Sequence, residues 1–262
     1  MTHSQDDKAA RFRALHERPG AFVIANPWDP GSASLLAGLG CEALATSSGA
    51  SAGVRGRKDG QLTREEALAH AREIVAATDL PVAADLENGF GESPAHVAET
   101  IQLAADAGLV GGSIEDFTGD KAHPFYDLDL AVQRIAAAAA AARALPFPFI
   151  LTARCEHFLR GHADLDATIA RLRAYEAAGA DVLFAPALPD LESIRTVCAA
   201  LRKPLNFMAG IPGKSFSVAE LAGVGVKRIS LATSLYRAAM KAVREAATEV
   251  HASGTFGYID RL

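Results

Sequence analysis

The stretch PVAADLENGFG, residues 81–91, decides how this sequence is interpreted. It begins as a short apolar run after a proline, which predicts a buried strand, and it then carries Asp85 and Glu87 at alternate positions. Side chains alternate between the faces of a strand, so both carboxylates should point the same way and repel each other. A divalent cation such as Mg²⁺, or alternatively Mn²⁺, would relieve that repulsion, and Gly89 and Gly91 would allow a tight turn beside it. The alternative is a strand end with two solvated acids before a turn.

The bulk composition argues against several classes of protein. The 262 residues carry a formal net charge of -5, so no general attraction to nucleic acid or anionic membranes is expected. The N-terminal segment is polar and acidic, unlike a signal peptide, and no apolar run is long enough to cross a bilayer. The cysteines Cys41, Cys155 and Cys198 show no metal-type spacing and predict no disulfide framework. Together these features predict a cytoplasmic protein.

Apolar runs and helical patterns alternate along the whole sequence. Strands are expected from residue 81 and at 21–26, 43–48, 111–115, 149–154, 181–186, 204–209 and 228–233. Helices are expected at 5–18, 63–78, 95–107, 164–178, 191–201, 218–222 and 234–253. One further helix should end at residue 39 and another should begin after residue 127, and a loop is expected at 50–61. This alternation over this length predicts a single (β/α)8 barrel domain spanning residues 1–262. A doubly wound sheet is disfavoured, because Gly89 and Gly91 lack the spacing of a dinucleotide-binding motif.

The polar residues of the sequence collect where the expected strands end. In a barrel these C-terminal ends share one mouth, whereas the opposite strand ends of this sequence carry mostly proline, glycine and alanine. This sorting favours a metal site over two solvated acids. The residues are Ser47, Ser48, Asp59, Asp85, Glu87, Glu115, Asp116, Arg154 and Glu156.

A site of this composition predicts both a metal and a substrate. Mg²⁺ usually takes few direct carboxylates and keeps several waters, so Asp85 is expected to touch it and Asp59, Glu87 and Glu115 to hold its waters. Arg154 suits a substrate carboxylate through bidentate pairing.

The backbone N–H groups of Ser48 and Gly49 could hold a second oxyanion. The implied substrate is a small 2-oxo or 2-hydroxy acid, and the metal would stabilise an enolate-like intermediate as a Lewis acid.

Several residues outside the strand-end cluster also bear on the function. No lysine lies inside an expected strand, which argues against a Schiff-base aldolase. The turn at 210–214 could bind phosphate, but an ordinary Gly/Pro turn explains it at least as well. Cys155 should point away from Arg154 and pack in the interior. Lys121, in the loop after the fourth strand, is interpreted equally well as a lid residue with acid/base chemistry or as exposed charge, and His123 is better explained as exposed charge.

The sequence resembles the phosphoenolpyruvate mutase/isocitrate lyase superfamily over nearly its full length. The matching segments, in order, are NPWDPGSA (26–33), TSSG (46–49), KDG (58–60), DLENGFG (85–91), SIED (113–116), AR (153–154) and ATSLYR (232–237). The resemblance, closest to a phosphoenolpyruvate phosphonomutase-like member, implies a (β/α)8 barrel with a gating loop after Glu115. It also implies a homotetramer, a dimer of dimers that exchanges the last helix, which here would begin at Ser234.

The resemblance also implies roles for individual residues. Mg²⁺ would lie at Asp85, supported by Asp59, Glu87 and Glu115. Substrate would contact Ser47, the backbone at Ser48 and Gly49, Trp28 and Arg154. Catalytic roles would fall to Lys121, Arg154 and Asp59.

The expected gating loop departs from the specialised subfamilies. Isocitrate and methylisocitrate lyases carry a cysteine motif there, but this sequence reads DKAHP at 120–124 and has no cysteine. Phosphonopyruvate-handling members carry a lysine and an asparagine; Lys121 matches the lysine and the asparagine is absent. The sequence therefore predicts a Mg²⁺-dependent lyase or hydrolase that cleaves a C–C bond in a small 2-oxo or 2-hydroxy dicarboxylate, with oxaloacetate as first guess. Phosphonomutase or phosphonopyruvate hydrolase activity and a non-catalytic 2-oxo acid-binding barrel are the alternatives.

Overall fold

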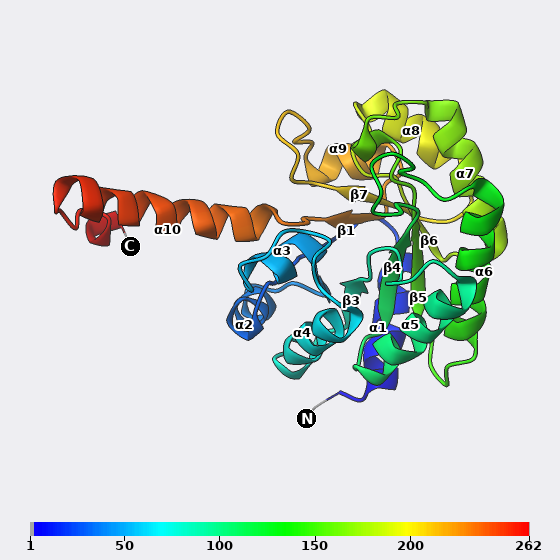
Figure 1. The fold of residues 1–262 in the computed structure, drawn as a ribbon, viewed down its shortest axis with the longest axis horizontal. Coiled ribbons are helices and arrows are strands. Elements are labelled where there is room, and N and C mark those ends of the chain that lie inside the picture. Colours follow the sequence, from blue (N-terminus) through cyan, green and yellow to red (C-terminus); the bar gives the residue numbers. More distant parts are fainter. Residues whose placement is uncertain (1–2, 262) are drawn as a thin grey trace.

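The computed structural model describes residues 3–261, and its centre is a barrel of eight parallel strands (Figure 1). The strand order is β1-β8-β7-β6-β5-β4-β3-β2, and an isolated parallel bridge between Ala25 and Leu44 joins the two ends of the sheet. The predicted (β/α)8 barrel is therefore confirmed. The strands are β1 (Phe22–Ile24), β2 (Leu44–Ala45), β3 (Val82–Asp85), β4 (Gly111–Glu115), β5 (Ile150–Arg154), β6 (Val182–Phe184), β7 (Leu205–Met208) and β8 (Arg228–Ser230).

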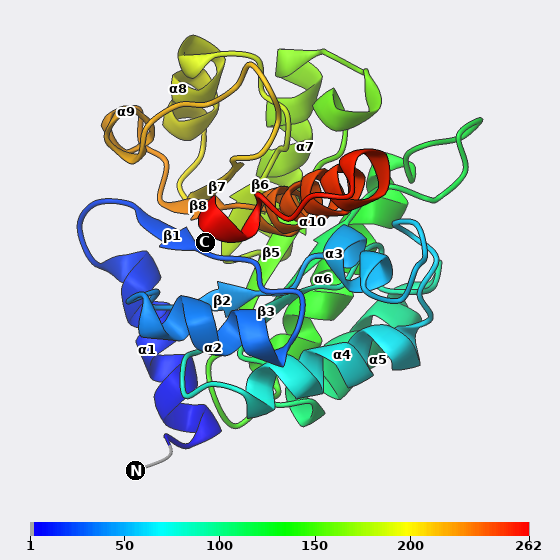
Figure 2. The ribbon, with the colours of Figure 1, turned by 90° about the vertical axis from the view of Figure 1, so that its left-hand side faces the viewer.

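Helices follow the strands and surround the barrel (Figure 2). Several begin where the sequence supplies a cap: Thr63 forms a capping box with Glu66, and Ser93 caps a helix that opens with Pro94. In the described part of the chain, no helix is both long and apolar enough to cross a membrane. The helices are α1 (Gln5–Glu17), α2 (Pro30–Gly38), α3 (Ser48–Gly53), α4 (Arg64–Ala76), α5 (Pro94–Asp106), α6 (Leu128–Arg143), η1 (Phe158–Arg160), α7 (Leu165–Ala178), α8 (Leu191–Ala200), α9 (Val218–Gly223), α10 (Ser234–Ser253) and η2 (Ile259–Arg261).

Two local expectations were wrong. The segment expected as a loop from residue 50 begins with the helix α3, because the chain turns into a helix directly after Ser47. The strand β3 ends at Asp85, and Glu87 has a φ of 49°, in the left-handed region that few residues with side chains adopt. The alternation of side chains along a strand therefore does not place Glu87 beside Asp85; a turn of the backbone does.

Asn26 closes the barrel at its seam. Its side-chain Nδ2 donates to the carbonyl oxygens of Ala45 and Thr46, at 3.0 and 3.1 Å, and its Oδ1 accepts from the Leu231 N–H at 2.8 Å. The side chain is only 4% exposed. One amide thus ties the ends of β1, β2 and β8 together just below the barrel mouth.

The last long helix lies apart from the barrel. In Figure 1, α10 projects as an arm, and none of its 20 residues is buried. Only its beginning is anchored: the ring centroids of Tyr236 and Trp28 lie 5.9 Å apart, and a Cβ on Gly53 would lie 2.7 Å from the Tyr236 ring. Met240 and Val243, 37% and 59% exposed, follow Tyr236 on the same helix face.

The substitution Asn26→Ala should lower the free energy of unfolding by about 3 kcal/mol, because it removes three hydrogen bonds and leaves their buried backbone partners without one. Urea unfolding followed by circular dichroism measures the loss. Gln133→Ala, which removes an exposed amide on α6, serves as the control and should change stability little. A loss below 1 kcal/mol for Asn26→Ala would show that the seam closes without this side chain.

Candidate active site

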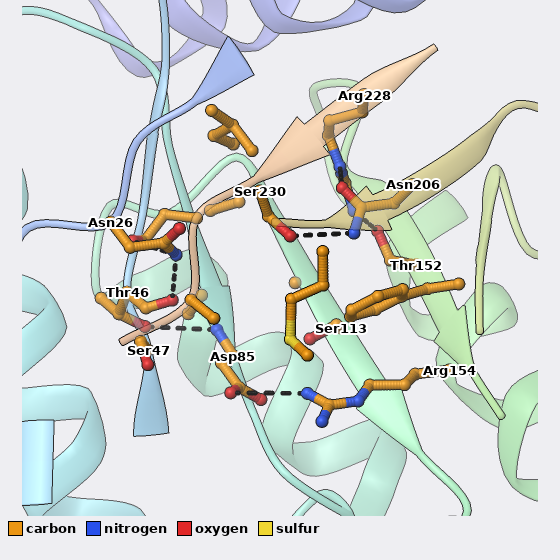
Figure 3. A pocket seen from close by; sticks show the side chains of 18 residues that line it. Asn26, Thr46, Ser47, Asp85, Ser113, Thr152, Arg154, Asn206, Arg228 and Ser230 are labelled. Carbon is orange, nitrogen blue, oxygen red and sulfur yellow. Dashed lines mark hydrogen bonds and ion pairs between the residues drawn. The ribbon is translucent and has the colours of Figure 1, made fainter. Parts of the chain in front are cut away.

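A cavity of about 60 Å³ lies inside the barrel, below its C-terminal mouth (Figure 3). Of the residues predicted to form the site, Ser47, Asp85 and Arg154 line it. The sequence analysis missed most of the other polar lining residues, although their alternation along β4, β5, β7 and β8 could have revealed them. These residues are Asn26, Thr46, Ser113, Thr152, Asn206, Arg228 and Ser230.

Arg154, at the end of β5, lies among three acidic side chains. Its Nε is 2.5 Å from Glu156 Oε1 and 3.4 Å from Glu115 Oε2, and its Nη1 is 3.8 Å from Asp85 Oδ2. Burial alone would lower the pKa of Arg154, but Glu156, Glu115 and Asp85 raise it above its ordinary value. Arg154 is therefore a fixed positive charge whose guanidinium also lies over the Phe184 ring, 5.0 Å from its centroid.

Asp85 is held in place from two sides. Its Oδ2 accepts from the Ser48 N–H at 3.2 Å and from the Ser48 Oγ at 2.9 Å, and its Oδ1 accepts from the Glu87 N–H at 3.2 Å. The Asp85 N–H in turn donates to Thr46 Oγ1 at 3.2 Å. The Ser48 N–H expected to hold an oxyanion thus binds the Asp85 carboxylate. Ser47, the residue before α3, makes no capping hydrogen bond with its side chain.

Two further carboxyl groups have strongly shifted pKa values. Burial, with the charges of Asp85 and Asp59 adding to it, raises the pKa of Glu87 to about 8. Burial, together with Glu156 and Asp85, raises the pKa of Glu115 well above its ordinary value, although Arg154 counteracts it. In both cases burial is the main cause of the raised pKa, and the neighbouring acids add to it.

Asp59 approaches the same cluster from the loop after α3. The residue is exposed, but a Cβ on Gly49 would lie only 3.5 Å from its carboxylate, and a Cβ on Gly60 would lie 4.0 Å from Glu87 Oε2. The same Cβ would lie 2.8 Å from Thr233 Cγ2, so Gly49 must be small for the start of α3 to pack against Thr233. The structure brings together all four residues predicted as metal ligands: Asp85, Glu87, Glu115 and Asp59.

Glu156 and Arg160 complete the arrangement, and Arg160 was missed in the sequence analysis. Glu156 is fully buried and accepts from Arg154 through one oxygen and from Arg160 Nε through the other, at 2.8 Å. Arg160 Nη2 is 4.0 Å from Glu115 Oε1, and its guanidinium lies 3.6 Å from the centroid of the Phe117 ring. Arg160 thus connects the carboxylate cluster with the base of the loop after β4.

Two predicted site residues lie away from this cluster. Lys121 is exposed at the tip of the loop, between Phe117 and Phe125, which pair through an isolated antiparallel bridge. Trp28 packs against Tyr236 at the base of α10 and does not line the cavity. The loop after β4 is therefore a short hairpin. Trp28 contacts helix α10 and not the cavity.

In the described part of the chain, one group of His, Cys, Asp and Glu residues has ligand atoms close enough together for a metal, and it lies outside the cluster around Arg154. In Asp116, Cys155 and His157, these atoms lie within 4.8 Å of one another, and all three residues are buried. The Asp116 carboxylate, however, already accepts from Tyr175 Oη at 2.8 Å and from Arg171 Nη1 at 3.2 Å. Burial raises the pKa of the Cys155 thiol, which keeps it protonated. This cluster anchors α7 to β4, and the prediction that Cys155 is buried is confirmed.

The charge balance at the cavity mouth favours a cation. Four acidic side chains (Asp85, Glu87, Glu115 and Glu156) surround two arginines (Arg154 and Arg160), and Asp59 adds a fifth acid. Carboxylate oxygens on rigid strand ends are the ligands that Mg²⁺ and Mn²⁺ prefer. The donor types of Asp85, Glu87 and Glu115 therefore suit a hard divalent cation, although their carboxylate oxygens are not gathered within 4.8 Å of one another as those of a metal-binding group would be.

The pKa of Glu87 predicts how the metal-free protein responds to pH. Because the folded pKa of about 8 lies above the unfolded value near 4.5, the folded state holds an extra proton between these values. The contribution of Glu87 to the stability of the folded state should be greatest below pH 4.5 and should fall as the pH rises toward 8. In EDTA, the melting temperature should therefore fall between pH 6 and pH 8.5, and Glu87→Gln should flatten that fall. An unchanged pH profile in Glu87→Gln would contradict the assignment.

The sequence and structure of the chain are similar to those of characterised enzymes. The family model described as phosphoenolpyruvate phosphomutase matches residues 12–251. A solved "putative lyase/mutase" from Burkholderia cenocepacia J2315 is 55% identical, with a TM-score of 0.96, and the match covers 98% of this chain and 92% of that one. A solved 2,3-dimethylmalate lyase, itself a member of the phosphoenolpyruvate mutase/isocitrate lyase superfamily, is 31% identical, with a TM-score of 0.86 over 95% and 89% of the chains.

A relative of known activity is similar over nearly the whole chain. The oxaloacetate decarboxylase of Chromohalobacter salexigens is 33% identical over 96% of this chain and 91% of its own length. The family model covers most of the chain, and the barrel and its carboxylate-lined mouth agree with the match. This chain is therefore an enzyme that belongs to the phosphoenolpyruvate mutase/isocitrate lyase superfamily.

Proposed function

We propose that this enzyme is a Mg²⁺-dependent lyase or hydrolase that cleaves a C–C bond in a small 2-oxo or 2-hydroxy dicarboxylate, with oxaloacetate as the first candidate. The observation that carries the proposal is the excess of acidic side chains around Arg154, with the pKa of Glu87 raised to about 8. A site with this charge gains stability by taking up a divalent cation, with Mn²⁺ as the alternative metal. The relatives' activities on C–C bonds support the same reaction class.

The metal would be held by Asp85, with Glu87, Glu115 and Asp59 positioned to bind its waters. When bound, it would supply Lewis-acid stabilisation of negative charge that develops on the 2-oxo oxygen. Asp85 can serve this role with little rearrangement, because Ser48 and the Glu87 N–H already fix its carboxylate.

The substrate carboxylate would bind between Arg154 and Ser47. Arg154 keeps its positive charge, because the surrounding acids raise its pKa, and its Nε bond to Glu156 fixes the plane of the guanidinium. The Ser47 side chain lines the cavity and makes no cap bond, and the Gly49 N–H follows at the start of α3. The small cavity volume restricts the substrate to a few carbon atoms at this depth.

The chemical step would use the electron demand of the 2-oxo group. In oxaloacetate, the bond from C3 to the distal carboxylate breaks and that carboxylate leaves as carbon dioxide. The electron pair forms a C2–C3 double bond and places negative charge on the 2-oxo oxygen, and C3 then receives a proton to give pyruvate. We propose Lys121 as a contributor to proton transfer and Asp59 as the acid that orients water. Lys121 lies at the loop tip, so this role requires the hairpin to fold over the mouth. The loop's base is already connected to the site, because Arg160 lies over Phe117.

Phosphonate chemistry is the second candidate. The family model's description, phosphoenolpyruvate phosphomutase, favours it, and Lys121 agrees with the lysine expected in such a loop. The described loop contains no asparagine, which the phosphonopyruvate-handling pattern also requires.

We further propose that the enzyme is a homotetramer in which α10 packs against a second copy, with no nucleic acid or membrane partner and a cytoplasmic location. In the single chain, Tyr236, Met240, Val243 and Ala247 line one side of an open groove with Ile211. An apolar stripe of this length on a helix without a buried residue is stabilised only by a covering surface.

Proton NMR of the purified protein with oxaloacetate and Mg²⁺ tests the proposed reaction. No-enzyme and EDTA controls are needed, because oxaloacetate decays unaided. Pyruvate formed faster than in the controls indicates decarboxylation, whereas acetate with oxalate indicates hydrolysis at the other C–C bond. No acceleration would remove oxaloacetate as the substrate, and turnover of phosphonopyruvate instead would establish the second candidate.

The substitution Asp85→Ala should abolish Mg²⁺-dependent turnover, a loss of at least about 1000-fold, because it removes the one acid placed to touch the metal. Circular dichroism should show an intact fold. Asp129→Ala, at an exposed position in the first turn of α6, is the matched control and should keep full activity. Full Mg²⁺-dependent activity in Asp85→Ala would refute the role of Asp85 as a metal ligand.

The substitutions Met240→Glu and Val243→Glu should break the assembly, since each places a charge on the apolar stripe of α10. Light scattering should give about four times the 27.4 kDa chain mass for the unmodified protein and a smaller species for the double variant. Leu39→Glu, which alters an equally apolar but differently placed side chain that is 73% exposed, should leave the mass unchanged. A monomeric unmodified protein would refute the proposal.

A further inference from the structure

Arg228 is a buried positive charge inside the barrel without an acidic partner. It lies at the start of β8, is 6% exposed, and forms no salt bridge with any acid in residues 3–261. Its Nε donates to Asn206 Oδ1 and its Nη2 to Thr152 Oγ1, both at 2.8 Å. Its Nη1 lies 3.4 Å from His16 Nε2.

These neighbours do not balance the charge. Burial lowers the pKa of Arg228 to about 9, so the guanidinium is still protonated at neutral pH. Burial and the nearby Arg228 lower the pKa of His16 to about 3, so its imidazole is neutral. A guanidinium has five N–H donors, and three acceptors are in place, which leaves two donors in a region that water barely reaches. Buried charges in proteins are normally paired with an opposite charge, and Arg228 has no such counterion among the described residues.

Arg228 lines the same cavity as Arg154 but at a different depth. Thr152, which accepts from Arg228, lies two residues before Arg154 on β5, about 6.6 Å deeper along the strand. Figure 3 shows Arg228, Asn206 and Thr152 on one side of the cavity and Arg154 with Asp85 on the other.

The inner end of the cavity is polar and small. Asn206 Nδ2 donates to Ser230 Oγ at 3.0 Å, which orients the amide with a second N–H still available. The cavity of about 60 Å³ has room for a few water molecules or for a small anion, such as a halide ion or a short carboxylate.

We propose that Arg228, Asn206 and Ser230 form an anion site at the inner end of the cavity, separate from the carboxylate-lined mouth, that takes one halide-sized or carboxylate anion. The anion has two possible sources. It is either a free chloride ion or the far carboxylate of a dicarboxylate whose other end lies against Arg154. The first source stands on the geometry alone, and the second rests on the proposed function. In the second case, Arg228 selects diacids over monoacids.

Crystals soaked in sodium bromide and, separately, in sodium malonate distinguish these sources. An anomalous bromide peak within hydrogen-bond distance of Arg228 and Asn206 that malonate does not displace supports a free halide. A malonate carboxylate at that position supports the substrate source. A site that holds only water in both soaks overturns the proposal and leaves Arg228 as a structural strut. Because the readout is occupancy and not turnover, it stands or fails independently of the reaction.

Melting temperature gives the matching test in solution. Sodium chloride should raise it by about 3 °C relative to sodium gluconate at equal ionic strength, because gluconate is too large for the cavity. Ser230→Val should abolish that difference while leaving the Arg228 contacts in place, and Arg228→Lys should keep part of it. Arg237→Gln, at an exposed position on α10, should respond as the unmodified protein does. Equal melting temperatures of the unmodified protein in chloride and gluconate, with malonate also without effect, would overturn the site even if Arg228→Lys fails to fold.

Discussion

The ion-pair cluster around Arg154 is the interaction on which the rest of this site depends. One guanidinium at the end of β5 is shared among Glu156, Glu115 and Asp85, and it is 11% exposed. Charges this deep are tolerated only when their partners are fixed, and here each partner is fixed by something else. Glu156 is held through its second oxygen by Arg160, and Asp85 is held by Ser48. The cluster therefore positions the mouth of the barrel as a single unit, and the acids that it gathers there are the basis of the proposed metal site.

The barrel supplies the rigidity that such a cluster needs. Asn26 joins three strand ends at the seam, and the isolated bridge beside it completes the ring of strands. Only two residues separate the short helix α3 from the end of β2, so the first N–H of the helix reaches the Asp85 carboxylate on the neighbouring strand. Glu87 is then turned out of the strand by a left-handed backbone conformation, at an energetic cost that the surrounding structure must offset. Strained conformations of this kind are characteristic of functional sites.

The interior of the barrel has charge at two depths. Arg154 faces acids near the mouth, whereas Arg228 faces only neutral groups further inside. An interior filled for stability alone would carry branched apolar side chains at these positions. The contrast between a compensated and an uncompensated arginine underlies our two proposals, a cation at the mouth and an anion at the inner end. A dicarboxylate is one ligand that could satisfy both demands.

The sequence by itself determined the barrel and most of the acids. The alternation of apolar runs with capped helices depends on local periodicity, and the acids at strand ends follow from it, since parallel strands bring their C-terminal ends together. Only the tertiary structure decided that Glu87 reaches the cluster through a turn and that Trp28 packs on Tyr236 instead of the cavity. It also decided that Arg228 has neutral partners and no acidic one among the described residues. These outcomes depend on contacts between residues far apart in the chain, such as Thr152 with Arg228, and the pattern of a single segment contains no information about them.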